Sequence, residues 1–196
     1  MSTVVDELVK VNVSLESRLP GLLFGGKGVM EADADGSGKK AKRRPIEEEA
    51  KLRAHWMGEG KDRQLCIPSV MLYKSFCQAA TDFTWEKNKK KSMVYIVGAT
   101  LAFEQENIPL ICEGYSVFAE WVRIPPRTGA MVKIGRPLIR EWKADFSLLI
   151  DDELWDVNQF EQIINHAGKT VGVGAWRPGL KGAYGRFRVT DFEVVE

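Results

Sequence analysis

The chain has 196 residues, of which 44% are hydrophobic and 28% charged, and its formal net charge is +1. This length predicts one globular domain, which can bury a sizeable core even if it carries an elaborate insertion. The near-zero net charge excludes a global attraction to polyanions, so any affinity for nucleic acid must come from local basic patches.

The three cysteines, Cys66, Cys77 and Cys112, cannot all pair and lack the spacing of metal ligands. We therefore expect reduced, partly buried thiols in a cytoplasmic protein. The N-terminus has no basic-then-apolar signal pattern, and no apolar run approaches the length of a membrane span. We expect a soluble protein with no membrane partner, no bound metal and no cofactor.

The first predicted element is a half-buried strand over residues 7–16, because Val9, Val11, Val13 and Leu15 alternate with their neighbours. After glycines that follow this strand, residues 30–65 are polar, with a basic run, an acidic run and few apolar side chains. Such a composition cannot bury a core of its own. It predicts a long, mobile loop that is helical in part around residues 46–55.

A helix is predicted from Ser69, a suitable N-cap, because Leu72 and Phe76 recur at helical spacing. A second basic run at residues 87–91 lies between segments predicted to be strands, and the apolar stretch 93–103 is the second of these. Two further strands are predicted at residues 117–124 and 142–150. The alternation of apolar and polar residues is cleanest in the last of these.

Asp151 or Asp152 is predicted to cap a second helix, which Gly168 ends. Its buried stripe consists of Leu154, Val157, Phe160, Ile163, Ile164 and Ala167. A glycine-rich segment follows, and the last strand covers residues 186–195. Single helices set among several strands indicate an α+β fold, for which β-α-β-β-α-β is the simplest template.

The glycine-rich segment, residues 172–189, contains five glycines, four basic residues and three aromatic residues. Glycine costs backbone entropy, so this density predicts sharp turns or close approach to the backbone. The interleaved basic and aromatic side chains are typical of contacts to phosphates and bases. An ordinary hairpin loop with turn glycines explains the same composition.

Three other motifs fail on their flanking residues. The segment 21–28 resembles a phosphate-binding loop, but Gly28 replaces the Ser or Thr that would bind magnesium, and no helix is predicted after it. The segment 33–38 resembles the start of a calcium loop, but Arg44 stands where a bidentate Glu is needed. The Gly-x-Gly that opens the glycine-rich segment follows a helix and precedes a strand, which is the reverse of the Rossmann order.

Three segments follow one another in an informative order: the opening strand leading into residues 19–26, the helix start at 67–74, and the terminal Gly-x-Gly…Gly-x-x-Gly-Arg-Phe-x-Val. This order resembles the RAMP superfamily of CRISPR-associated proteins, which has an apolar strand ending near Gly-Gly, an Ile-Pro-Gly-Ser-Ser-Leu-Lys-Gly-like helix start and a glycine-rich loop before the final strand. The chain departs from that pattern at residues 69–74, where the small turn is replaced and the lysine is shifted by one place.

The resemblance implies a single RAMP-like domain over residues 1–196, with an RRM/ferredoxin-like antiparallel sheet and two main helices. It also implies that residues 30–65 form a long thumb-like insertion. The likeness is greatest to the backbone subunits that polymerise along guide RNA in surveillance complexes. The compact length implies a solitary or mobile-element relative, such as a phage-borne one.

The first functional hypothesis is a module for RNA or single-stranded nucleic acid that assembles head-to-tail as a homo-oligomer or filament, or with other effector subunits. Backbone amides of the glycine-rich segment would contact phosphates, basic side chains would supply charge, and Trp176 and Tyr184 would stack on bases. The candidate contacts are Gly172, Gly174, Trp176, Arg177, Lys181, Gly182, Tyr184, Gly185, Arg186, Arg188, Lys74, Lys39, Lys40, Lys42, Arg43, Arg44, Lys89 and Lys90.

Two alternatives stay open. In some RAMP relatives an Asp in the thumb supplies metal-dependent cleavage of bound target RNA, and Asp33 and Asp35 lie in the corresponding region. Solvated loop acids explain the same two residues, and Mg-dependent cleavage lost in Asp33→Ala or Asp35→Ala would decide between these readings. The other alternative is a decoy that mimics a backbone subunit, with Trp56 and Met57 as anchors for a protein partner.

Overall fold

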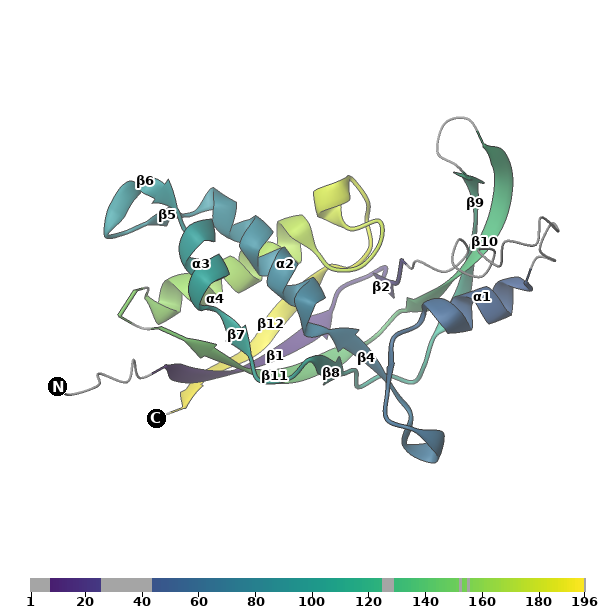
Figure 1. Cartoon of the computed structure of the whole chain (residues 1–196), viewed down its shortest axis with the longest axis horizontal. Helices are drawn as coiled ribbons and strands as arrows, with labels where there is room; N and C mark the ends of the chain where they lie inside the picture. The colour runs from purple at the N-terminus through teal and green to yellow at the C-terminus, as the bar shows by residue number, and fades with distance from the viewer. Residues whose placement is uncertain (1–7, 26–43, 125–128, 152, 155, 196) are drawn as a thin grey trace, which may run out of the picture.

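The structure is a computed structural model that describes residues 8–25, 44–124, 129–151, 153–154 and 156–195. Its central element is a four-stranded antiparallel sheet of order β12-β1-β11-β7. The strands are β1 (Val9–Ser17), β7 (Ala102–Phe103), β11 (Lys143–Ile150) and β12 (Phe187–Val195). The first and last strands of the chain are therefore neighbours, and the start of β1 lies beside the end of β12 (Figure 1).

Three helices cover one face of this sheet: α2 (Ser69–Ala79), α3 (Val94–Thr100) and α4 (Val157–His166) (Figure 1). The core between the layers centres on Phe76 of α2, whose ring lies 6.1 to 6.5 Å from the rings of Phe103, Phe160 and Phe187. The alternation in β1 places every second side chain in the core, as predicted: Val11, Val13 and Leu15 are buried toward the helices.

A second sheet, of order β2-β10-β9, extends away from the first (Figure 1). It contains β2 (Leu22–Leu23), β9 (Ser116–Ile124) and β10 (Ala130–Ile139), and α1 (Ile46–Arg53) packs against β10. A buried carboxylate secures this packing, because Glu49 accepts a 3.0 Å hydrogen bond from the Gly135 amide. Next to it, the Arg136 guanidinium pairs with the buried carboxylate of Glu120.

Short elements connect the two parts. The strands β3 (Trp56–Met57), β4 (Gln64–Pro68) and β8 (Asn107–Pro109) form a three-stranded sheet, and a 3-10 helix, Gly60–Asp62, lies between β3 and β4. The strands β5 (Thr84–Trp85) and β6 (Asn88–Ser92) form a hairpin after the 3-10 helix Ala80–Asp82. Two further turns, the π-helical Ala167–Val171 and the 3-10 helix Pro178–Leu180, follow α4.

The structure confirms the predicted α+β class with an antiparallel sheet. The strands predicted at 7–16, 117–124, 142–150 and 186–195 are β1, β9, β11 and β12, and the helix predicted from Ser69 is α2. The helix expected around residues 46–55 is α1, and it is packed rather than mobile: Ala50 is fully buried. The three cysteines are free, as predicted, with Cys66 buried and the other two half-buried.

The strand predicted at residues 93–103 was wrong, because tertiary contacts override the local pattern there. The stretch 93–103 is mainly the helix α3, because Met93, Val97 and Leu101 stack at a spacing of four residues into the core. The α-helix predicted to end at Gly168 ends at His166, and a π-helical turn continues from Ala167 to Val171. A Cβ on Gly168 would lie 2.2 Å from the Phe187 carbonyl oxygen, so this glycine admits β12 beneath the turn.

The predicted start of the second helix was also wrong. Asp156 is its N-cap and accepts a 2.9 Å hydrogen bond from the Asn158 amide. Asp151 instead accepts hydrogen bonds from the Glu153 and Leu154 amides in the turn that precedes the helix. Asp152 lies outside the described residues. The chain thus uses an aspartate cap, but one full turn later than the sequence indicates.

The environment of His55 indicates that the stability of the fold depends on pH. Its ring meets Phe24 edge-on with centroids 4.9 Å apart, and its Nε2 is buried with no hydrogen-bond partner among the described residues. Burial lowers the pKa of this imidazole below its usual 6.5. The neutral form is therefore favoured in the folded state. The contribution of neutral His55 to the free energy of unfolding is fully present above pH 6.5. It is lost progressively as the pH falls from 6.5 through the lower pKa of the folded state.

We expect the free energy of unfolding in urea to decrease over this range in the wild-type chain. The His55→Gln variant removes the titrating group and should flatten the dependence. An unchanged pH profile in that variant would assign the effect to other groups.

Candidate nucleic-acid interface

The glycine-rich loop, residues 172–186, links the π-helical turn to β12 and is tied to the start of the chain. The Ala175 amide donates to the Leu23 carbonyl at 2.7 Å, and the Gly185 amide donates to the Gly21 carbonyl at 2.7 Å. Within the loop, the Val173 amide donates to the Gly185 carbonyl at 2.9 Å. Two of the three segments that carried the sequence resemblance, around Gly21 and at the terminal glycines, therefore meet in space.

The loop glycines are required by the chain's own backbone. A Cβ on Gly185 would lie 1.7 Å from the Val173 oxygen, one on Gly182 would lie 1.8 Å from the Trp176 oxygen, and one on Gly174 would lie 2.5 Å from the Leu23 oxygen. No side chain fits at those distances. The prediction of close approach at these glycines agrees with this geometry, and the approaching group is the protein itself.

The expected contact between loop amides and phosphates stays a prediction, and the hydrogen bonds within the loop bear on it. Many of these amides already donate hydrogen bonds to carbonyl groups of the protein, and a donor that is already bonded is a poor phosphate ligand. They are the amides of Gly172, Val173, Ala175, Leu180, Lys181, Gly182, Tyr184 and Gly185. A phosphate could bind these amides only by displacing those bonds, so side chains are the better candidates for such a contact.

Trp176 and Lys181 are held in an unusual backbone conformation. Their φ angles are +51° and +61°, and they are the non-glycine residues of the described chain with positive φ. A left-handed conformation costs a non-glycine residue about 1 to 2 kcal/mol, and such strain concentrates at functional positions. Trp176 is nevertheless 50% exposed, and Lys181 is exposed as well. The loop thus presents an indole and an ammonium group to solvent on a rigid support.

Helix α2 supports the loop and adds a basic residue beside it. The buried Ser75 hydroxyl donates to the Gly172 carbonyl at 2.9 Å, and Arg177 donates from Nη2 to the Gln78 side-chain oxygen at 3.3 Å. Lys74 is exposed and lies one helical turn before Gln78, so it shares the face of α2 that the loop contacts. This arrangement brings Lys74, Arg177 and the two left-handed residues into one neighbourhood.

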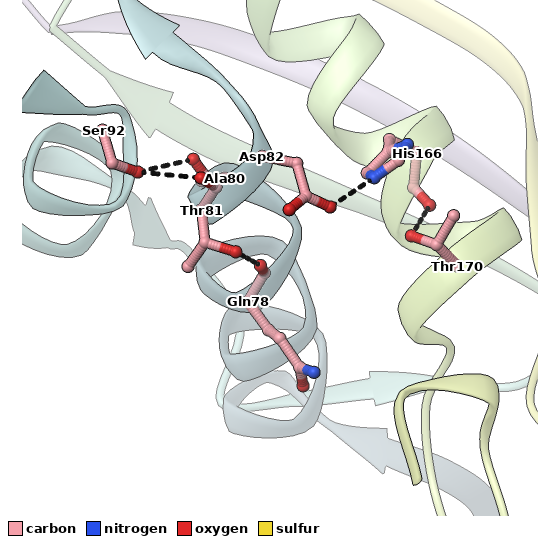
Figure 2. A network of polar contacts seen from close by, with 7 residues as sticks. All are labelled: Gln78, Ala80, Thr81, Asp82, Ser92, His166 and Thr170. Carbon is pink, nitrogen blue, oxygen red and sulfur yellow. Dashed lines mark hydrogen bonds and ion pairs between the residues drawn. The ribbon is translucent and has the colours of Figure 1, made fainter. Parts of the chain in front are cut away.

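A polar network fixes α2 relative to the helix that leads into the loop (Figure 2). His166 at the end of α4 contacts Asp82 through Nε2 and Oδ2 at 2.8 Å, and Thr170 in the π-helical turn donates to the His166 carbonyl at 2.9 Å. On the α2 side, Thr81 donates to the Gln78 carbonyl at 2.7 Å. The network thus fixes α2, which contacts the loop, relative to α4, which precedes the loop in the chain.

Two other predicted contacts, Tyr184 in the loop and Arg188 on β12, already have partners. The Tyr184 ring lies 5.7 Å from the Phe118 ring of β9, in a tilted arrangement, and is half-buried. Arg188 donates two hydrogen bonds to Glu16, at 2.6 and 3.0 Å, and this guanidinium lowers the pKa of the Glu16 carboxyl. Arg186 is exposed.

The remaining predicted contacts lie elsewhere or outside the described residues. Lys89 and Lys90 are exposed on β6, which projects to the left of α2 in Figure 1, whereas the loop lies to its right. Arg44 is exposed just before α1. Lys39, Lys40, Lys42, Arg43, Asp33 and Asp35 lie outside the described residues.

The face of the central sheet opposite the helices does not offer an aromatic platform. RRM domains stack bases on aromatic side chains of this face. Here the alternation places the following residues of β1, β11 and β12 there: Lys10, Asn12, Ser14, Glu16, Lys143, Asp145, Ser147, Leu149, Arg188, Asp191, Glu193 and Val195. None of them is aromatic, so stacking by the strands themselves has no support in this fold.

The described part of the chain offers no ready metal site and no membrane-spanning helix. It contains no group of three or more His, Cys, Asp or Glu side chains arranged to hold a metal ion. No helix in it is long and apolar enough to cross a membrane.

Burial raises the pKa of all three cysteine thiols. For Cys66 desolvation is the sole cause of the rise in pKa.

Comparisons with known proteins show a similarity of fold. No model of a protein family and no curated protein matches the chain. Among solved structures, a chain in the cryo-EM structure of the Type III-B Cmr-beta bound to cognate target RNA matches with a TM-score of 0.57 and 11% sequence identity. The match covers 97% of this chain and 61% of that one, so this protein spans about three fifths of the length of its structural neighbour.

Proposed function

We propose that this protein binds RNA or another single-stranded nucleic acid through the glycine-rich loop and the adjoining face of α2. Trp176 carries the proposal, because a half-exposed indole is kept at φ +51° in a loop that is otherwise built for tight packing. An exposed aromatic ring flanked by basic side chains suits base stacking with charge neutralisation of the backbone. Lys74, Arg177 and Lys181 supply that charge.

The similarity to a chain of an RNA-bound Cmr-beta structure supports the same proposal at the level of fold. We extend it to a backbone-subunit-like role, in which the chain forms one RAMP-like domain and associates head-to-tail with copies of itself or with other effector subunits. In this proposal residues 30–65 form the thumb. Within its described part, α1 packs on β10, and β3 pairs with β4.

Replacement of Trp176 by glycine should separate stability from binding. Glycine relieves the left-handed strain of about 1 to 2 kcal/mol, which offsets the lost packing of the ring, so the melting temperature should change little. The affinity for a fluorescent single-stranded RNA should fall about tenfold or more, because loss of one stacked base costs about 1 to 3 kcal/mol. Fluorescence anisotropy and thermal unfolding measure the two effects on the same samples.

Two variants at the same position provide the controls. Trp176→Asn tolerates positive φ without an aromatic ring and should bind as weakly as Trp176→Gly. Trp176→Phe keeps a ring and should retain most of the affinity. Equal affinity in all four proteins would contradict a stacking role for this residue.

A further inference from the structure

Two long strands in the described part of the chain have an outer edge that no other strand pairs with. One is β9, at the end of the β2-β10-β9 sheet, and the other is β12, at the end of the central sheet. Both are nine residues long. An edge strand presents a row of backbone donors and acceptors that can pair with another chain.

The edge strand β9 carries apolar and basic side chains on one of its two faces. The register with β10 places Trp121 opposite Lys133 and Arg123 opposite Met131, so these four side chains share one face. Trp121 is 62% exposed and Met131 is 48% exposed. The one acidic residue of β9, Glu120, points to the other face, where it pairs with Arg136.

The edge at β12 is apolar and acidic. Its pairing with β1 is interrupted by a bulge at Thr190 and is regular from Asp191 to Val195. In this regular part Asp191 and Glu193 are exposed on the face away from the helices, and Val194 and Val195 are 42% and 38% exposed. A matching strand would therefore need basic and apolar side chains.

We propose that β9 of one copy adds antiparallel to β12 of a second copy of this chain. The register that sets Arg123 opposite Asp191 also sets Trp121 opposite Glu193 and Ala119 opposite Val195. This register places Lys133 one strand away from Glu193. It uses five residue pairs, all within the regular part of β12.

This contact is heterologous, because the two edges differ. The two segments lie toward opposite ends of the molecule, with the β9–β10 hairpin at the right of Figure 1 and the end of β12 at the left. A heterologous contact repeats from copy to copy and builds a ring or an open chain. Pairing of like edges would instead bring two basic or two acidic edges together. The inference rests on the head-to-tail assembly in the proposed function and names the surfaces that form it.

Charge reversal tests the contact on the full chain, freed of nucleic acid. In sedimentation velocity, the average mass of the wild type should rise with protein concentration beyond that of a monomer. Arg123→Glu on one edge, or Asp191→Lys with Glu193→Lys on the other, should weaken self-association about tenfold or more, because like charges then face each other. An equimolar mixture of the two variants should associate again, since each reversed edge then meets a complementary one. Lys61→Glu and Glu59→Lys change charges at exposed positions between β3 and β4 and should associate as the wild type does.

Three outcomes would overturn the proposal: a wild type that stays monomeric at every concentration, reversal variants that associate normally, or a mixture that fails to recover. A short RNA that spans one copy separates this result from the proposed function. The Arg123→Glu variant should bind that RNA as the wild type does, and Trp176→Gly should assemble normally while it loses RNA affinity. Loss of assembly with intact RNA binding, or the reverse, therefore identifies which of the two ideas fails.

Discussion

Gly185→Ala should lower the free energy of unfolding by about 3 kcal/mol or more, from the sum of left-handed strain and overpacking. The residue has a φ of +72°, and a Cβ would lie 1.7 Å from the Val173 carbonyl oxygen, which is a backbone atom that cannot rotate away. The Gly185 amide also donates a hydrogen bond to the Gly21 carbonyl, so a shift of the loop would break this link to the start of the chain. Urea unfolding followed by tryptophan fluorescence measures the effect.

Gly60→Ala is the matched control. Its φ of +59° carries a similar left-handed penalty, but a Cβ there meets nothing within 4 Å. We expect a loss of about 1 to 2 kcal/mol, which is the strain alone. If the two variants were equally stable, the close approach at Gly185 would have no energetic consequence, and the packed description of the loop would be wrong.

The double variant Arg177→Ala, Lys181→Ala should weaken RNA binding more than any single change in the loop. Arg177 is oriented by Gln78 and Lys181 by its left-handed backbone, so both charges are held in place before RNA arrives. Removal of two phosphate contacts should reduce the slope of log affinity against log salt by about 1.4, at about 0.7 per charge for single strands. The affinity itself should fall about tenfold or more at low salt.

Anisotropy titrations over a series of salt concentrations give both quantities. Lys51→Ala with Lys61→Ala removes two exposed charges outside the loop and should leave the slope unchanged. An identical slope in the two double variants would mean that the loop charges do not contact phosphates.

The elements that the sequence predicted correctly are those with a strong internal period. The alternation in β1 and β11 and the helical spacing of Leu72 and Phe76 in α2 each specify a buried face without reference to the rest of the chain. The strand β10 was not predicted, and it contains Gly135 and Pro137, two residue types that are uncommon inside strands. In the structure, contacts with distant segments explain both residues. Gly135 leaves room for the Ile46 carbonyl of α1, and the Pro137 carbonyl accepts a hydrogen bond from the Phe24 amide.

The candidate site was predictable only in outline. Glycine density correctly indicated a backbone that is closely approached. The Leu23 oxygen that approaches Gly174 and the Gly21 oxygen that bonds Gly185, however, lie about 150 residues earlier in the chain. No local pattern reports a contact of that separation. The positive φ of Trp176 and Lys181 was equally hidden, since neither residue type favours it. The sequence therefore located the loop, whereas its conformation singles out the two residues.

The most direct test of the central claim is a titration of the wild-type chain, purified free of nucleic acid, into labelled single-stranded RNA at low salt. The proposal predicts saturable binding that weakens steeply as salt is added, because charge neutralisation by Lys74, Arg177 and Lys181 contributes much of the affinity. A flat titration at low salt, with a folded protein and intact RNA, would contradict the proposed function.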